Sequence, residues 1–163
     1  MLQNIKKRNP STQKGFTIIE VMIVLAIAGL IMLVVFLAVP ALQRNSRNTT
    51  IKNDASALAA GISEYASNNN GSAPNKITQD TTDHSKLLVG DTGTSQATAK
   101  VNGSTTLGNT APQTAPSSFA AGTLYWGTGK SCDGTTTSRA STVWYYVEVS
   151  GTPSGTPKCV DAN

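Results

Sequence analysis

An uninterrupted apolar run near the N-terminus constrains this chain more than any other feature. Val21 to Val39 are nineteen consecutive residues without a charged or polar side chain, and Glu20 is the one ionisable residue between Phe16 and Leu42. An apolar run of this length is sufficient to cross the hydrocarbon core of a bilayer as an α-helix. The sequence therefore predicts a transmembrane helix within residues 16–42.

The basic residues on either side of the run indicate its orientation. Lys6, Lys7, Arg8 and Lys14 precede it, whereas the nearest cations after it are Arg44 and Arg47. The denser basic cluster is expected on the cytoplasmic side, so residues 1–15 are predicted to be cytoplasmic and the chain after Gln43 to be exported. Residues 16–163 carry nine basic and nine acidic side chains. Their zero net charge argues against nucleic acid as a partner.

A cleaved secretory signal peptide is the alternative interpretation of the apolar run. Ala26-Ile27-Ala28 before Gly29 resembles its small-residue cleavage site. However, the apolar sequence continues for ten residues after Gly29, and Glu20 interrupts what should be a continuous apolar core. The retained membrane helix is therefore the favoured interpretation.

Beyond Pro40 the apolar spacing is that of one helix face. The apolar positions follow steps of four and three residues: Ile51, Ala55, Leu58, Ile62 and Tyr65. The run Asn68-Asn69-Asn70-Gly71 supplies residues that accept the left-handed conformation at a helix terminus. We therefore expect residues 43–70 to continue the helix in amphipathic form.

The remaining sequence divides into two parts. Residues 71–118 are rich in Ser, Thr, Asn and Gly, and we expect a variable, exposed loop there, with at most a short strand or hairpin, that contributes little core. Residues 119–163 contain Leu124-Tyr125-Trp126 and the alternating segment Thr142–Val149, which predict an antiparallel sheet. The apolar face of this sheet requires the helix stripe as its partner, so the fold class is α+β.

The two cysteines, Cys132 and Cys159, both lie on the side predicted to be exported. Oxidation is available there, and a bond between them is expected to stabilise the C-terminal region by roughly 3 to 4 kcal/mol through loop closure. Two free thiols remain the alternative if the chain stays in a reducing compartment.

No motif in the sequence predicts catalysis, a cofactor or a metal site. The single histidine, His84, lies in a polar stretch, which favours an exposed loop residue over a member of a catalytic triad or a zinc site. No phosphate-binding loop or EF-hand spacing is present. Three triplets, beginning at Asn48, Asn70 and Asn102, fit the N-glycosylation acceptor pattern, as expected by chance in an Asn- and Thr-rich chain.

The segment from Lys14 to Ile27, KGFTIIEVMIVLAI, closely resembles the N-terminal segment of type IV prepilins and of the related type II secretion pseudopilins. The shared features are a basic leader that ends in Gly15, then Phe16, and then Glu20 inside an apolar helix. The resemblance covers residues 6 to about 45. It implies the type IV pilin fold, cleavage between Gly15 and Phe16 by a prepilin peptidase, N-methylation of the new Phe16 amine, and a role for Glu20 in assembly.

The function implied by the resemblance is structural and not enzymatic. The chain would be stored in the cytoplasmic membrane as a prepilin, with membrane lipid around its helix, and then polymerise with copies of itself into an extracellular type IV pilus filament, or fimbrium. Its partners would be the peptidase and methyltransferase, the assembly platform and its ATPase; adhesion and twitching motility are roles of such filaments. A minor pilin or a pseudopilin is the alternative within this class. A membrane-anchored extracellular binding domain is the alternative from a different class.

Glu20 has a physical reason for pairing that is independent of the resemblance. A carboxylate near the middle of a bilayer helix costs about 2.5 to 3.5 kcal/mol, and less near its edge. Glu20 lies four residues from Phe16, or about 6 Å along a helix. The Phe16 amine of a neighbouring subunit is therefore a natural partner for Glu20. A protonated Glu20 that faces water is the alternative.

Gly29 and Pro40 are the candidate positions for a kink in the apolar helix. Proline lacks the amide hydrogen and clashes with the carbonyl of the preceding turn. Pro40 stands three positions later than the first proline common in pilins. Ordinary tolerance of Gly and Pro in membrane helices is the alternative explanation for both residues.

Overall fold

The computed structural model describes residues 15–91, 94–108, 120–149, 152–153 and 157–162. The chain divides into two compact units, residues 1–40 and 41–163. One helix, α1 (Ile18–Asn68), contributes to both units and contains Pro40. Among the described residues nine strands follow: β1 (Lys76–Gln79), β2 (Lys86–Asp91), β3 (Thr94–Lys100), β4 (Thr106–Leu107), β5 (Thr123–Lys130), β6 (Thr136–Tyr145), β7 (Glu148–Val149), β8 (Thr152–Pro153) and β9 (Lys158–Asp161).

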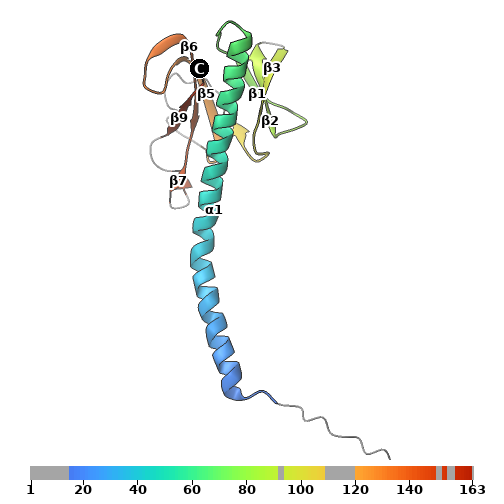
Figure 1. Cartoon of the computed structure of the whole chain (residues 1–163), viewed down its shortest axis with the longest axis vertical. Helices are drawn as coiled ribbons and strands as arrows, with labels where there is room; N and C mark the ends of the chain where they lie inside the picture. The colour runs from blue at the N-terminus through green and yellow to red at the C-terminus, as the bar shows by residue number, and fades with distance from the viewer. Residues whose placement is uncertain (1–14, 92–93, 109–119, 150–151, 154–156, 163) are drawn as a thin grey trace, which may run out of the picture. The chain divides into compact units, whose positions relative to one another are not determined.

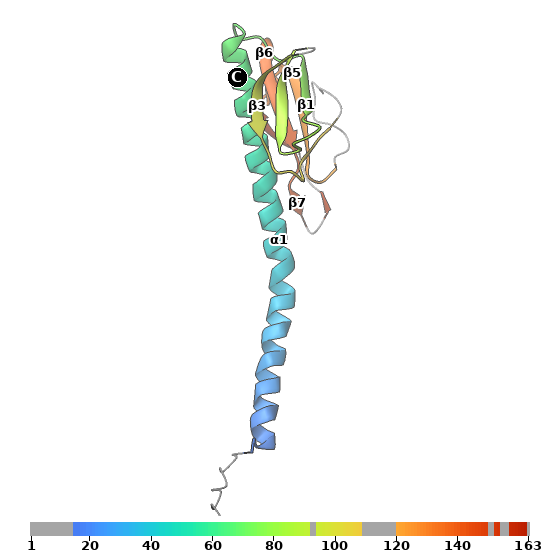
Figure 2. The same ribbon diagram turned by 90° about the vertical axis from the view of Figure 1, so that its right-hand side faces the viewer.

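The strands of the second unit form three sheets. The first has the order β1-β2-β3 and the second the order β4-β5-β6-β9, while β7 and β8 form a two-stranded ribbon. All pairings are antiparallel except that of β4 with β5, which is parallel. Figures 1 and 2 show the two larger sheets beside the C-terminal part of α1. The class is α+β, consistent with the type IV pilin fold.

The predicted helix stripe forms the centre of the core. Its five residues are buried, with Ala55, Leu58 and Ile62 completely inaccessible to solvent. Ala59 of α1 is also buried, and the strands and the residues next to them supply the other core side chains: Ile77, Leu87, Val89, Ala97, Ala99, Val101, Leu124, Trp126, Val143, Tyr145 and Ala162. The stripe from Ile51 to Tyr65 is therefore the face of α1 on which the sheets pack.

The helix ends where the sequence predicts. Asn68 is its last residue, and Asn70 and Gly71 adopt left-handed backbone angles with φ of 55° and 77°. The Gly71 N–H donates a hydrogen bond of 2.7 Å to the carbonyl oxygen of Ala66. This bond satisfies one of the orphan carbonyl groups at the helix terminus.

The structure corrects the expectation of a loop over residues 71–118. Residues 76–100 form the three-stranded sheet β1-β2-β3, while 109–118 lie outside the described residues. The prediction failed because β3 buries only Ala97 and Ala99, which give a weak apolar signal. Small residues suffice because the helix approaches closely: a Cβ atom on Gly61 would lie 3.1 Å from the Cβ of Ala99.

The expected strand over residues 142–149 begins and ends earlier than predicted, since β6 spans Thr136–Tyr145. β6 ends at Tyr145, and Glu148 and Val149 belong to the separate ribbon β7-β8. The Asn48 side chain explains the break, since its Nδ2 donates to the Glu148 carbonyl at 3.0 Å and its Oδ1 accepts from the Glu148 N–H at 2.7 Å. These bonds hold the backbone of Glu148 on α1, so the pairing of β6 with β5 and β9 does not continue to this residue.

Tyr65 is a core residue with a raised pKa. Its buried hydroxyl hydrogen-bonds to Asp91, and this bond, together with burial and the negative charge of Asp91, raises the pKa of Tyr65 to about 12. Asp91 also accepts a bond of 2.8 Å from the Nδ2 of Asn75. The pair thus joins the last turns of α1 to the end of β2.

We expect folding stability to decline between pH 10 and 12 because of Tyr65. Below pH 10 the tyrosine is protonated in both the folded and the unfolded state. Between pH 10 and 12 the unfolded chain loses this proton while the folded protein retains it. The free energy of unfolding therefore falls over this range, until the pH passes 12. Chemical denaturation across this range checks the prediction. In the control variant Tyr65→Phe this part of the decline should be absent, and an unchanged slope would contradict the assignment.

Candidate functional site

The predicted cleavage junction is open to solvent. Gly15 and Phe16 precede the first turn of α1, and Phe16 is 86% exposed. A Cβ atom added at Gly15 would meet no atom within 4 Å. The fold of the chain therefore does not require glycine at position 15, so any requirement for it must come from a protein that binds this junction.

Thr17 and Glu20 form a capping box at the start of α1. The Thr17 N–H and hydroxyl donate to Oε2 of Glu20 at 3.2 and 3.1 Å, and the Glu20 N–H donates to Oγ1 of Thr17 at 3.3 Å. Reciprocal bonds of this kind satisfy amide groups that lack partners in the first helical turn. The carboxylate favours helix initiation in addition to its predicted role in assembly.

The capping box leaves part of the Glu20 carboxylate available. Both bonds that Glu20 accepts from the described residues end on Oε2. The other oxygen, Oε1, can accept a further hydrogen bond without breaking the cap. The side chain of Glu20 is exposed in the single subunit, so a cation from another molecule can reach it.

The apolar segment is exposed throughout the first unit. Every residue from Gly15 to Pro40 is exposed, including the aliphatic side chains on all sides of the helix. Among the described residues, α1 is the one helix long and apolar enough to cross a membrane, and its most apolar window has a mean hydropathy of 3.2. An apolar surface of this extent requires lipid or protein to cover it.

Gly29 and Pro40 both lie inside α1. The helix is continuous through both positions, and a Cβ atom at Gly29 would meet nothing within 4 Å. No packing contact in the single subunit thus requires glycine at position 29. A kink or unwinding at Gly29 and Pro40 stays a prediction.

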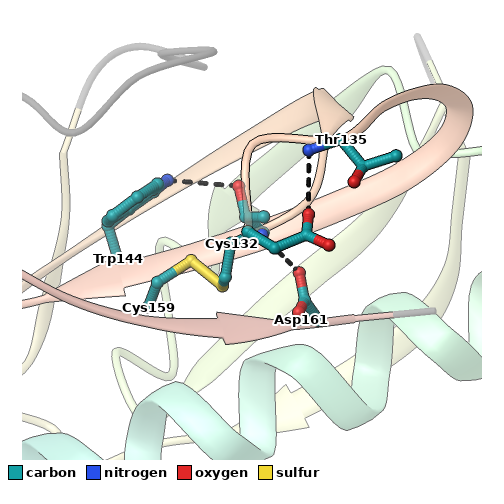
Figure 3. The surroundings of a disulfide bond; sticks show 7 residues. Cys132, Thr135, Trp144, Cys159 and Asp161 are labelled. Atoms are coloured by element: carbon teal, nitrogen blue, oxygen red, sulfur yellow. Dashed lines mark hydrogen bonds between the residues drawn. A yellow bond between two sulfur atoms is a disulfide. The ribbon is translucent and has the colours of Figure 1, made fainter.

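The structure brings Cys132 and Cys159 to disulfide geometry, with a distance of 5.7 Å between their Cα atoms. Figure 3 shows the sulfur atoms beside Trp144, whose register partner on β9 is Cys159. The Cys132 N–H donates to Oδ1 of Asp161 at 2.7 Å. The disulfide and this hydrogen bond together tie the connection between β5 and β6 to the edge strand β9.

A hollow of about 390 Å³ lies beside Glu148 of β7, and Arg47 and Asn102 are among its other lining residues. Nη2 of Arg47 lies 2.7 Å from Oε2 of Glu148, and Nε of Arg47 also donates to this carboxylate at 3.0 and 3.1 Å. These hydrogen bonds and the positive charge lower the pKa of Glu148. The charged groups of the hollow therefore bind each other.

The described residues contain no cluster of three or more His, Cys, Asp or Glu side chains that could hold a metal ion. His84 is exposed in the connection between β1 and β2, and its carbonyl oxygen accepts a hydrogen bond from Gln79 at 2.8 Å. The geometry thus places His84 in a loop and brings no catalytic partner to it among these residues.

A comparison with protein families identifies the N-terminal segment. The family model described as the prokaryotic N-terminal methylation motif matches residues 10–36, a range that includes Gly15, Phe16, Glu20 and Gly29. No curated protein and no solved structure matches the chain. Residues 10–36 thus carry the prepilin-type cleavage and methylation signal, and the α+β fold is consistent with the type IV pilin fold.

Thr17 is the site residue that the sequence analysis missed. The signal was present, because Thr17-Ile18-Ile19-Glu20 has the spacing of a capping box immediately before an apolar run. The basic residues of the leader, including Lys14, lie outside the described residues.

Proposed function

We propose that this protein is the structural subunit of a type IV pilus-like filament. It is inserted in the cytoplasmic membrane with residues 1–15 inside, cut before Phe16, methylated on the new amine, and polymerised through residues 16–42. The observation that carries this proposal is the motif match over residues 10–36, within which an exposed apolar helix begins at Ile18 with Glu20 in its first turn.

The exposed helix supports polymerisation because lipid and then other subunits can cover its apolar surface in turn. Lipid covers it in the stored precursor, and the same surfaces of other subunits cover it in the filament. The free oxygen of Glu20 supports the pairing with the Phe16 amine of a neighbour. The unit of residues 41–163 has its own core, so it can remain folded while the first unit exchanges lipid for protein.

Replacement of Gly15 by leucine tests the processing step. The expected result is an uncut precursor held in the membrane and no filament, because the peptidase must accommodate residue 15 in its own site. The fold should be unaffected, since apart from the adjacent residues no part of the chain that the structure describes lies within 4 Å of the added Cβ atom. Mass spectrometry of the membrane fraction and of sheared filaments checks the N-terminus and its methyl group.

Gly29→Leu is the matched control for Gly15→Leu, because it places the same side chain at another open glycine of the same unit. Cleavage of the Gly29→Leu chain should be normal. Normal cleavage and filament formation by the Gly15→Leu chain would overturn the assignment. A different result is possible for the chain without substitutions. If that chain is cut and methylated but never appears in filaments, the protein is instead an anchored extracellular domain.

A further inference from the structure

The tripeptide Asn-Gly-Ser occurs twice in this chain, at residues 70–72 and 102–104. An asparagine followed by glycine is prone to attack by the glycine amide nitrogen on its own side-chain carbonyl, because no Cβ atom obstructs the approach. The two sites have identical local sequence. Any difference in their reactivity must therefore come from the folded structure.

At Asn70 the fold holds the attacking nitrogen away from this reaction. The Gly71 N–H donates a hydrogen bond of 2.7 Å to the carbonyl of Ala66 and terminates α1. Asn70 and Gly71 both have the left-handed backbone angles of this cap. Attack by the Gly71 nitrogen would require the helix terminus to open, so we expect this site to be protected.

At Asn102 the same tripeptide is arranged differently. The Ser104 N–H and hydroxyl both donate to Oδ1 of Asn102, at 3.0 and 2.7 Å. The Gly103 N–H makes no hydrogen bond with the described residues, and a Cβ atom at Gly103 would meet nothing within 4 Å. Asn102 and Gly103 are both exposed, so water can reach the side-chain amide.

The Ser104 donors lie where negative charge would develop. Attack on the Asn102 side-chain carbonyl converts its oxygen, Oδ1, to an oxyanion in the transition state. Two hydrogen-bond donors already directed at that oxygen stabilise the charge without reorganisation. The turn itself is closed by the Thr105 N–H, which donates to the main-chain carbonyl oxygen of Asn102 at 2.8 Å.

We propose that Asn102 is a site of spontaneous deamidation in the folded protein, whereas Asn70 is protected. The Gly103 nitrogen forms a bond to Cγ of Asn102, the bond from Cγ to Nδ2 breaks, and the proton of the Gly103 amide leaves with the nitrogen as ammonia. Water then opens the resulting five-membered imide at either carbonyl. The products are aspartate or isoaspartate at position 102, each with one additional negative charge at neutral pH.

The modification would act on a structural anchor. The buried carboxylate of Asp54 accepts a hydrogen bond from the Asn102 N–H at 3.1 Å and another from the hydroxyl of Thr105. A new carboxylate at position 102 would lie close to Asp54 and repel it. Isoaspartate would also add a methylene group to the main chain of the turn. Both products weaken the attachment of this turn to α1.

The test uses the full chain, folded in detergent micelles and incubated at mildly alkaline pH. Lys76, Lys86 and Lys100 separate the two tripeptides, so trypsin places them in different peptides and mass spectrometry measures each rate. We expect deamidation at Asn102 to be at least about tenfold faster than at Asn70, which corresponds to about 1.4 kcal/mol in activation free energy. In denaturant the two rates should become similar, because the local sequences are the same.

Ser104→Ala removes one donor from Oδ1 and is expected to slow the reaction at Asn102. Its matched control is Ser72→Ala, which makes the same change in the other tripeptide and should leave both rates unaltered. Equal rates at the two sites in the folded protein, or a faster rate at Asn70, would overturn the proposal. An unchanged rate in Ser104→Ala would show that the donors do not activate the carbonyl and would overturn the oxyanion mechanism.

Discussion

Replacement of Cys159 by serine is expected to lower the free energy of unfolding of the unit formed by residues 41–163 by about 3 to 4 kcal/mol. The two cysteines are 27 residues apart in sequence, and a bond between them restricts the unfolded chain. Among the described strands, β9 is an edge strand that pairs only with β6 in its sheet, so few other interactions hold it. Denaturant unfolding of the exported protein measures the change.

Cys132→Ser and the double variant are the controls for Cys159→Ser. If one bond joins the two residues, the three variants should lose nearly the same stability, because each breaks the same bond. The hydrogen bond from Cys132 to Asp161 uses the backbone N–H and is available in every variant. Two alkylatable thiols in native material, or additive losses in the double variant, would contradict the disulfide.

The apolar periodicity predicted those parts of the fold in which the local sequence shows which face of an element is buried. Leu58 and Ile62 recur at helical spacing, and both are fully buried in the core. The Asn70-Gly71 terminus was equally predictable, because left-handed backbone angles are readily adopted by these residue types. In such segments the local sequence contains most of the information that the fold uses.

The sequence could not predict features that depend on distant residues. Ala99 fills its place in the core because Gly61 allows close approach of α1, and nothing in the local pattern of residues 94–100 shows this. The end of β6 depends on the bonds between Asn48 and Glu148, which are separated by 100 residues. The local apolar alternation predicted a strand that continues to Val149, whereas β6 ends at Tyr145 because of these long-range polar contacts.

The candidate site was predictable to a greater extent than the sheets, because it consists of one continuous segment. Gly15, Phe16 and Glu20 were identified through the resemblance of residues 14–27 to prepilins, and the motif match covers the same three residues. The Thr17 cap adds a second use for the Glu20 carboxylate. A variant of Glu20 alone therefore changes both helix initiation and charge, and its interpretation requires a variant that changes only the first.

Replacement of Glu20 by valine is expected to abolish or strongly slow filament assembly while the precursor accumulates in the membrane. Removing the carboxylate makes membrane insertion easier, by up to about 2.5 to 3.5 kcal/mol if the residue lies deep in the bilayer. The same change leaves the Phe16 amine of a neighbouring subunit without its partner during packing. In a low-dielectric bundle of helices an unpaired charge is strongly unfavourable, so the variant should also enter wild-type filaments poorly.

Thr17→Val is the matched control for Glu20→Val, because it removes the hydroxyl of the capping box and keeps the carboxylate. The loss of this cap is expected to cost about 1 kcal/mol of helix stability, and the Thr17→Val chain should still assemble. The measurement is the ratio of sheared filament to membrane-held subunit, with cleavage before Phe16 followed separately. If Glu20 acts through its charge, only Glu20→Val lowers this ratio. If both variants lower it equally, the carboxylate acts through helix initiation, and a wild-type ratio in Glu20→Val would show that assembly does not need the carboxylate.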